Sequence, residues 1–96
     1  MITEIAVLNI RKGQSVAFEE AFVKAQPIIE ASKGYIQHEL QQCMEEDDKY
    51  LLIVRWKTIE DHTTGFRESA GYKEWKALLH PFYSPFPAVE HYKRIF

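Results

Sequence analysis

The stretch KYLLIVRWK, residues 49–57, decides the fold class, because its centre is a run of five apolar side chains without a polar interruption. A strand with one wet face alternates apolar and polar residues, whereas an unbroken run is typical of a strand covered on both faces. The acidic tip EEDD at residues 45–48 precedes this run, and residues 35–44 before it alternate with a period of two. The two segments predict a β-hairpin, and a second sheet is needed to cover the face that one helical layer leaves bare.

The N-terminal third of the chain predicts a strand followed by a helix. Residues 2–10 are apolar at both odd and even positions, so both faces of this strand are expected to be largely buried. The helix is expected to begin with Ser15 as its N-cap and to end at Gly34, with apolar side chains at helical spacing between them. Pro27 lies inside that pattern and has no amide proton, so we expect a kink or a break there.

The C-terminal half predicts a second, interrupted helix and a last strand. Residues 58–61, TIED, have the pattern of a capping box with Asp in the third position after the cap. Gly65 and residues 68–71 weaken the helical pattern before it resumes up to Pro81, so this helix is expected to be broken in the middle. Residues 88–96 predict the final strand, which gives the order βαββαβ.

This order predicts an α+β fold of the ferredoxin-like type, in which a four-stranded antiparallel sheet carries both helices on one face. A chain of 96 residues is expected to form a single domain, residues 1–96. The second face of the sheet would then expose a contiguous apolar patch. We therefore expect a homodimer in which two sheets meet face to face.

Charge and hydropathy argue against nucleic acid and membrane partners. The formal net charge is -2, and Lys and Arg are interspersed with Asp and Glu, so no positive field for phosphate binding builds up. No apolar stretch approaches the ~20 residues that span a bilayer, and the first residues lack the pattern of a signal peptide. We therefore expect a cytoplasmic protein.

Five short stretches resemble the antibiotic biosynthesis monooxygenase (ABM) family. They are residues 50–56, TIEDH at 58–62, GFR at 65–67, YKEW at 72–75 and VEHY at 89–92, and the resemblance covers essentially the whole chain. It implies a dimeric α+β barrel with a cavity between the sheet and the helices of each subunit. Members of this fold family include cofactor-free monooxygenases acting on aromatic polyketides, haem-degrading enzymes, isomerases and proteins of unknown role.

The resemblance implies a site on the second helical region. Family monooxygenases place an Asn, a Trp and a Tyr there at i, i+4 and i+10, where this sequence has His62, Phe66 and Tyr72. A phenol that has lost its proton reacts with O2 by itself, so the protein must bind a planar ring, stabilise an oxyanion and move protons. His62 and Tyr72 are therefore the predicted catalytic residues, His62 for proton transfer or oxyanion binding and Tyr72 as a hydrogen-bond donor.

Four residues are predicted to bind the substrate, namely Trp56, Phe66, Trp75 and His91. The three aromatic ones also fit core packing, because they recur at regular spacing. Alternation along the last strand puts His91 on the same face as Val89. His38, on the second strand, is a candidate to face His91 across the sheet or across the dimer.

No metal or nucleotide cofactor is predicted. The histidines stand at positions 38, 62, 80 and 91, which are 24, 18 and 11 residues apart, so no pair lies on one helical face as in common zinc motifs. The single cysteine, Cys43, belongs to no CxxC motif. The four glycines form neither a dinucleotide fingerprint nor a phosphate-binding loop.

Two other activities of the fold family find less support. Haem degradation would require an Asn, a Trp and a His at the positions that are here Ala6, Phe66 and Lys76, although His80 is a candidate haem ligand nearby. An isomerase acting on phosphorylated metabolites would need a basic cluster at its pocket, for which the candidates are Arg55, Lys57 and Arg67.

The sequence therefore predicts a cofactor-independent monooxygenase that uses O2 on a small aromatic or quinol-like substrate in an apolar cavity. The alternative is a non-catalytic homodimer of the same fold, which binds a small hydrophobic ligand or has a structural role. One observation separates the two. If backbone groups bind both the imidazole of His62 and the hydroxyl of Tyr72, neither side chain is free to act in catalysis, which contradicts the enzyme hypothesis.

Overall fold

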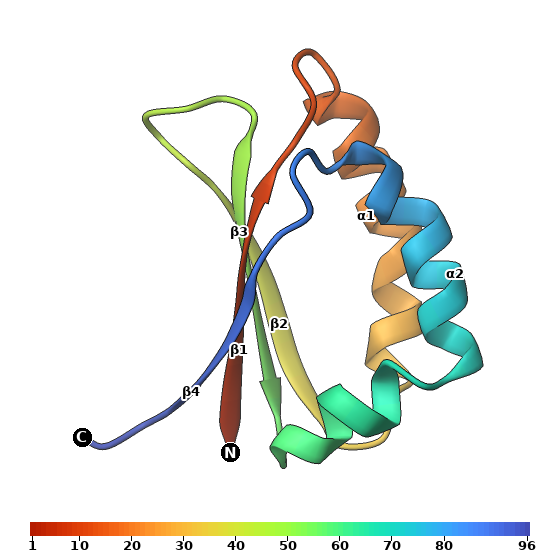
Figure 1. The fold of residues 1–96 in the computed structure, drawn as a ribbon, viewed down its shortest axis with the longest axis vertical. Coiled ribbons are helices and arrows are strands. Elements are labelled where there is room, and N and C mark those ends of the chain that lie inside the picture. Colours follow the sequence, from red (N-terminus) through yellow and green to blue (C-terminus); the bar gives the residue numbers. More distant parts are fainter.

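A computed structural model describes residues 1–96 as a sheet covered by helices on one face (Figure 1). The elements in chain order are β1 (Ile2–Asn9), α1 (Ser15–Glu30), β2 (Tyr35–Gln42), β3 (Lys49–Trp56), the π-helix η1 (Asp61–Phe66), α2 (Ala70–Leu79), the 3₁₀-helix η2 (His80–Phe82) and β4 (Val89–Lys93). The four strands are antiparallel in the order β2-β3-β1-β4. The predicted α+β, ferredoxin-like fold is confirmed. Neither α-helix has both the length and the apolar character that a membrane-spanning helix requires.

The core lies between the sheet and the two α-helices. Even-numbered residues of the two central strands face the helices, among them Leu8 of β1 and Val54 of β3, which are fully buried. The helices contribute the buried side chains of Phe18, Phe22, Ala25 and Ile29 from α1, and of Trp75 and Leu79 from α2. This packing fixes which face of each strand can point a side chain toward the helices.

The other face of the sheet is bare. Neighbouring pairs across β1 and β3, Ile5 with Ile53 and Val7 with Leu51, carry apolar side chains on this outer face. No helix of the chain covers them (Figure 1). The side chain of Val7 is 38% exposed. The apolar runs of β1 and β3 predicted that both faces of these strands are covered. Within one chain, only the face toward the helices is covered.

Helix α1 corrects the prediction that Ser15 is the N-cap, and it excludes one of the two outcomes predicted at Pro27, a break. Ser15 is not the N-cap, because it already belongs to the helix and its hydroxyl donates a hydrogen bond to the carboxylate of Asp48 at 2.7 Å. The start of the helix is thereby tied to the β2–β3 hairpin. Pro27 does not break α1, because it lies in the last turn, where its missing amide proton costs only one intrahelical bond and the burial of Ile29 beyond it holds the turn in place.

The predicted capping box at residues 58–61 is confirmed. The hydroxyl of Thr58 accepts a hydrogen bond from the backbone amide of Asp61 at 3.2 Å, and the carboxylate of Asp61 accepts one from the amide of Thr58, also at 3.2 Å. Gly34 makes room for this carboxylate, because a Cβ at that position, which has φ +82°, would overlap it. The box begins the helical turn that carries His62.

The predicted interruption of the second helical region is also confirmed. Residues 67–69 separate η1 from α2, and the hydroxyl of Ser69 caps α2 by accepting a hydrogen bond from the amide of Tyr72 at 3.1 Å. Strand β4 is shorter than the predicted segment 88–96. Its partner β1 begins at Ile2, opposite Lys93, so later residues have no strand to pair with.

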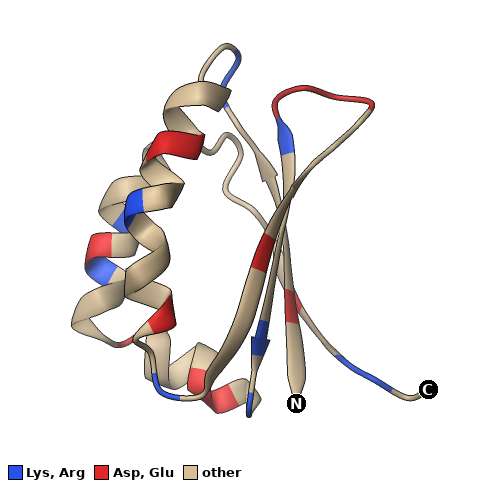
Figure 2. Ribbon diagram, turned by 180° about the vertical axis from the view of Figure 1, so that it is seen from behind, with Lys and Arg blue, Asp and Glu red and all other residues tan.

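Charged residues are mixed in space as they are in sequence. Figure 2 shows basic and acidic positions side by side along the outer surface of the helices, and an acidic tip on the β2–β3 hairpin. The basic positions of the two α-helices therefore do not form an uninterrupted basic stripe of the kind that binds a nucleic acid backbone.

Candidate functional site

A cavity of about 380 Å³ lies between the sheet and the helical layer. Ten of its fifteen lining residues are hydrophobic, and they include Leu8 and Leu52 from the sheet and Phe66 and Trp75 from the helices. This volume is within the range of small-ligand sites, which are mostly apolar with a few polar groups that orient the ligand. We refer to it below as the sheet–helix cavity.

The polar side of the cavity is built around Glu4, whose side chain projects from β1 toward the helices. Glu4 is only 6% exposed, and its Oε1 accepts a hydrogen bond from the indole N–H of Trp56 at 2.9 Å. Burial raises the pKa of the Glu4 carboxyl to about 6, against the opposing effects of the Trp56 hydrogen bond and the positive charge of Arg67. This carboxyl group therefore changes protonation state close to neutral pH.

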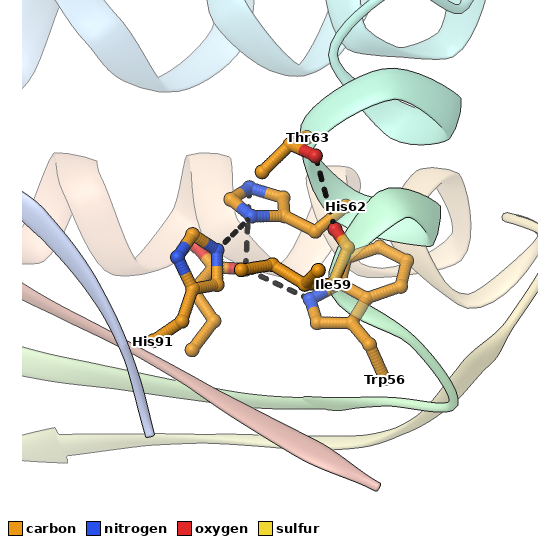
Figure 3. A network of polar contacts seen from close by, with 6 residues as sticks. Trp56, Ile59, His62, Thr63 and His91 are labelled. Atoms are coloured by element: carbon orange, nitrogen blue, oxygen red, sulfur yellow. Dashed lines mark hydrogen bonds and ion pairs between the residues drawn. The ribbon is translucent and has the colours of Figure 1, made fainter. Parts of the chain in front are cut away.

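His62, from η1, lies directly beside Glu4. The residue is 3% exposed, and its imidazole is stacked on the indole of Trp56, with ring centroids 5.4 Å apart and an interplanar angle of 23°. Its Nε2 is 3.4 Å from Oε1 of Glu4, and its Nδ1 is 2.8 Å from Nε2 of His91 on β4. Figure 3 shows the imidazole of His62 held between Trp56 and His91.

The imidazole of His62 is neutral near pH 7. Burial lowers its pKa to about 3, and the charges of Arg67 and of a protonated His91 act in the same direction. A neutral imidazole has one N–H and one lone pair. The tautomer that serves both neighbours has the proton on Nε2, toward Glu4, and accepts a hydrogen bond on Nδ1 from His91.

The backbone of η1 explains how His62 reaches this place. The amide of Arg67 bonds to the carbonyl of His62, five residues earlier, at 3.1 Å, which is the hydrogen-bond pattern of a π-helix. His62 and Phe66 are both buried beneath this turn, and the side chain of Arg67 borders the cavity. Single π-turns of this kind occur frequently at functional sites.

A second set of polar side chains, from α2 and the segment after it, borders the cavity. The rings of Tyr72 and His80 are 5.9 Å apart, and those of His80 and Tyr83 are 5.4 Å apart. Neither tyrosine hydroxyl has a hydrogen-bond partner within the chain. Both hydroxyl oxygens keep some accessible surface, and both residues line the cavity, so a ligand in the cavity can reach them. Burial raises the pKa of Tyr83 and lowers that of His80, so both groups are neutral near pH 7.

Residues 1–78 match the family model for antibiotic biosynthesis monooxygenase. The chain belongs to this family. It is also 58% identical over 95 residues to the uncharacterized protein YczJ of Bacillus subtilis (strain 168), which covers 99% of this chain and 100% of YczJ.

Solved structures of similar proteins have the same fold. A crystal structure from Bordetella bronchiseptica, named for the same monooxygenase family, is 29% identical with a TM-score of 0.95, covering 99% of this chain and 97% of that one. SnoaB, described as a cofactor-independent oxygenase from Streptomyces nogalater, is 17% identical with a TM-score of 0.80, covering 97% of this chain and 91% of SnoaB. At that identity the likeness to SnoaB shows the fold alone.

Four of the residues predicted from the ABM resemblance border the sheet–helix cavity, namely His62, Phe66, Tyr72 and Trp75. The other two, Trp56 and His91, do not. Trp56 is fully buried behind His62, where it holds Glu4, and His91 flanks His62 at the edge of the sheet. No cluster of three or more His, Cys, Asp or Glu side chains suited to a metal ion occurs in the structure.

Within the subunit, the prediction that His38 faces His91 is wrong. The two residues lie in one row across the sheet but on opposite edge strands, with Val54 and Glu4 between them. The imidazole of His38 is instead engaged near α1, 2.6 Å from the hydroxyl of Tyr35 and 2.8 Å from Oε1 of Gln26.

Glu4 is the functional candidate that the sequence analysis missed. A signal was present, because Glu4 is the only charged residue between Ile2 and Asn9 and shares the strand face of Ala6 and Leu8, which is buried. A charge on the apolar face of a short strand is costly unless it is hydrogen-bonded or has a task.

Replacing the buried carboxyl by a neutral amide tests its protonation. The folded-state pKa of Glu4 is above its ordinary value of 4.5, so its contribution to stability is full below pH 4.5 and is lost as the pH rises through 6. A rise from 4.5 to about 6 corresponds to about 2 kcal/mol. We predict that Glu4→Gln, which keeps an acceptor for Trp56, gains about that much stability over wild type between pH 4.5 and pH 7.5 in urea unfolding.

The control is Glu74→Gln, which removes an exposed carboxylate from α2. It should show no such gain with pH. A difference between Glu4→Gln and wild type that stays constant over this pH range would contradict the burial of an ionisable Glu4.

Proposed function

We propose that this protein is a cofactor-independent monooxygenase that oxidises a small aromatic or quinol-like substrate with O2 in the sheet–helix cavity. The observation that carries this proposal is the convergence of a buried, ionisable carboxyl–imidazole pair and an unbonded tyrosine hydroxyl on one apolar cavity. The pair is Glu4 and His62, and the hydroxyl is that of Tyr72.

The reaction needs little from the protein beyond binding and proton transfer. Loss of a proton converts a phenol into an electron-rich anion that transfers electrons to O2 directly. One oxygen atom then enters the product as a carbonyl and the other leaves as water, so a CH2 group of the substrate becomes C=O and supplies all four electrons. The site must hold the ring, stabilise the anion and accept the proton.

Each predicted residue has a place in this scheme. Phe66 and Trp75 present aromatic surface to the substrate ring, and Tyr72 donates a hydrogen bond to the oxyanion. His62 moves the proton, since its neutral imidazole can accept at one nitrogen and release at the other. Trp56 and His91 act on the substrate through Glu4 and His62, because neither borders the cavity.

The geometry favours the enzyme over the non-catalytic alternative. The imidazole of His62 is held by the side chains of Glu4 and His91, and the hydroxyl of Tyr72 has no partner in the chain. Neither the imidazole nor the hydroxyl is hydrogen-bonded to a backbone group. Membership of the ABM family supports the same reaction class.

An isomerase of phosphorylated metabolites finds no basic cluster here. Of its three candidate residues only Arg67 borders the cavity, whereas the guanidinium of Arg55 contacts the hydroxyl of Thr3 at 3.4 Å. A single arginine opposite a carboxylate provides a weak site for a phosphate group.

Oxygen uptake tests the proposal. We predict that the protein consumes O2 with one or more members of a panel of anthrones, naphthols and hydroquinones, and that ¹⁸O from ¹⁸O2 enters the product. Tyr72→Phe and His62→Gln should each lower the rate by about tenfold or more, because each loses a proton-transfer or oxyanion group.

The matched control is Tyr92→Phe, because the Tyr92 hydroxyl bonds to Glu90 and lies outside the sheet–helix cavity. It should leave the rate unchanged. Absence of uptake above buffer with every compound, from protein whose circular dichroism shows it folded, would favour the binding dimer.

We also propose that two subunits associate through their bare sheet faces. The outer-face pairs Ile5 with Ile53 and Val7 with Leu51 lie on the two central strands, so they form the middle of an apolar surface without a cover in the chain. Such surfaces are rare on monomers of this size and usually pair with a second copy or a partner.

Two valine substitutions test this interface. Wild type should have twice the monomer mass of 11.3 kDa by light scattering at micromolar concentration. Val7→Glu places a charge on the bare face and should give monomer, whereas Val16→Glu, on the outside of α1, should stay dimeric although Val16 is 73% exposed, more than Val7. A monomeric wild type would exclude the interface.

A further inference from the structure

We infer that Glu4 is the general base of the site and that His62 and His91 form a proton route from Glu4 to the protein surface. This inference rests on the proposed function, since it names the group that starts the reaction. It also extends that function, because it assigns a base and an exit path for the proton to residues of β1, η1 and β4.

The position of Glu4 fits a base. It is the only carboxylate that borders the sheet–helix cavity. Its Oε1 is occupied by the indole N–H of Trp56, while its Oε2 makes no hydrogen bond within the chain and is not a sealed buried atom. One oxygen is thus anchored to β3 and the other is left to receive a proton from a molecule in the cavity.

The groups around Glu4 suit this task. His62 approaches from η1, Arg67 from the turn after it, His91 from the neighbouring strand β4 and Tyr83 from the segment after η2, and none of these is a second carboxylate. Burial raises the pKa of Glu4 to about 6, so near pH 7 the group is mostly ionised and its conjugate acid is still a moderate acid. A base whose pKa is close to the working pH accepts and releases a proton with little cost.

The histidines continue the path outward. Oε1 of Glu4 is 3.4 Å from Nε2 of His62, and Nδ1 of His62 is 2.8 Å from Nε2 of His91. His91 is half-buried on β4, which is an edge strand, so it lies between the core and water. Each neutral imidazole can take a proton on one nitrogen while giving one from the other.

The step is a simple proton transfer. The substrate O–H, or the C–H of its keto tautomer, breaks, and its electron pair stays on the substrate as a phenolate. The proton passes to Glu4. For its release, His62 and His91 take the tautomers opposite to the resting ones, with their protons on Nδ1. Glu4 then gives its proton to Nε2 of His62 while Nδ1 of His62 gives one to Nε2 of His91, and Nδ1 of His91 releases one to water. No oxidant takes part, so this step is expected to run without O2.

Anaerobic hydrogen–deuterium exchange separates the base from the oxidation. In D2O without O2, the protein should accelerate exchange of the methylene protons of anthrone, followed by ¹H NMR. The rate should rise with pH and level off above pH 6, because only ionised Glu4 acts as a base. Glu4→Gln should slow exchange by about a hundredfold, the lower range for loss of a general base, whereas Glu74→Gln should match wild type.

The proton route has its own readout. His91→Phe keeps Glu4 and a ring against His62 but removes the outer imidazole. Exchange by this variant should be slow and should recover on addition of imidazole buffer, because a soluble proton carrier replaces the missing group. Glu4→Gln should not recover, and Glu4→Asp, whose carboxylate is one methylene shorter, should recover part of the activity without imidazole.

The outcomes distinguish this inference from the oxidation itself. Exchange that depends on Glu4 in the absence of any O2 uptake would support the base and refute the monooxygenase. Oxygen uptake that survives in Glu4→Gln, or the absence of catalysed exchange in wild type, would overturn the assignment of Glu4. Loss of exchange in His91→Phe that imidazole does not restore would overturn the route.

Discussion

The hydrogen bond from the indole of Trp56 to the carboxylate of Glu4 is the contact on which the arrangement of the site depends. A carboxylate beneath a helical layer is expensive to bury, and it is tolerated when strong donors satisfy it. Trp56 supplies that donor, and its ring also forms the surface on which His62 stacks. One residue therefore fixes both partners of the carboxyl–imidazole pair.

The scaffold explains why these groups meet. Antiparallel pairing places Glu4 beside Val54 on one side and His91 on the other, so a base and an outer imidazole come from neighbouring strands. The capping box that begins after β3 then brings His62 over them from above. Because strands and helix starts hold these side chains, little reorganisation is needed before a ligand binds.

Much of the fold was predictable because its signals are local. The apolar run at 50–54 and its acidic hairpin tip, the capping box and the weak middle of the second helix all depend on residues close in sequence. The partner of Ser15 was not predictable in this way, since Asp48 is distant in sequence and its carboxylate competes for the hydroxyl that would cap the helix. The separation of His38 from His91 likewise required the sheet order.

The site was predictable only in part for the same reason. The family spacing pointed to His62, Phe66 and Tyr72, and these do border one cavity. Glu4 has no hydrogen-bond partner near it in sequence. Alternation along the strand predicts that its side chain faces the core, but it does not predict which group donates a hydrogen bond to the carboxylate. Trp56 and His91 were selected as substrate contacts, but register and burial place them behind the cavity wall, where they hold and extend the polar pair.

The most direct test of this account is the titration of the Glu4 side chain in the folded protein, followed by the ¹³C shift of its carboxyl carbon, with Glu4→Gln used to assign the signal. The account predicts a midpoint near pH 6, set by burial against the Trp56 hydrogen bond and the Arg67 charge. A midpoint at 4.5 or below would mean that the carboxylate is solvated, and it would contradict the buried base at the centre of the site.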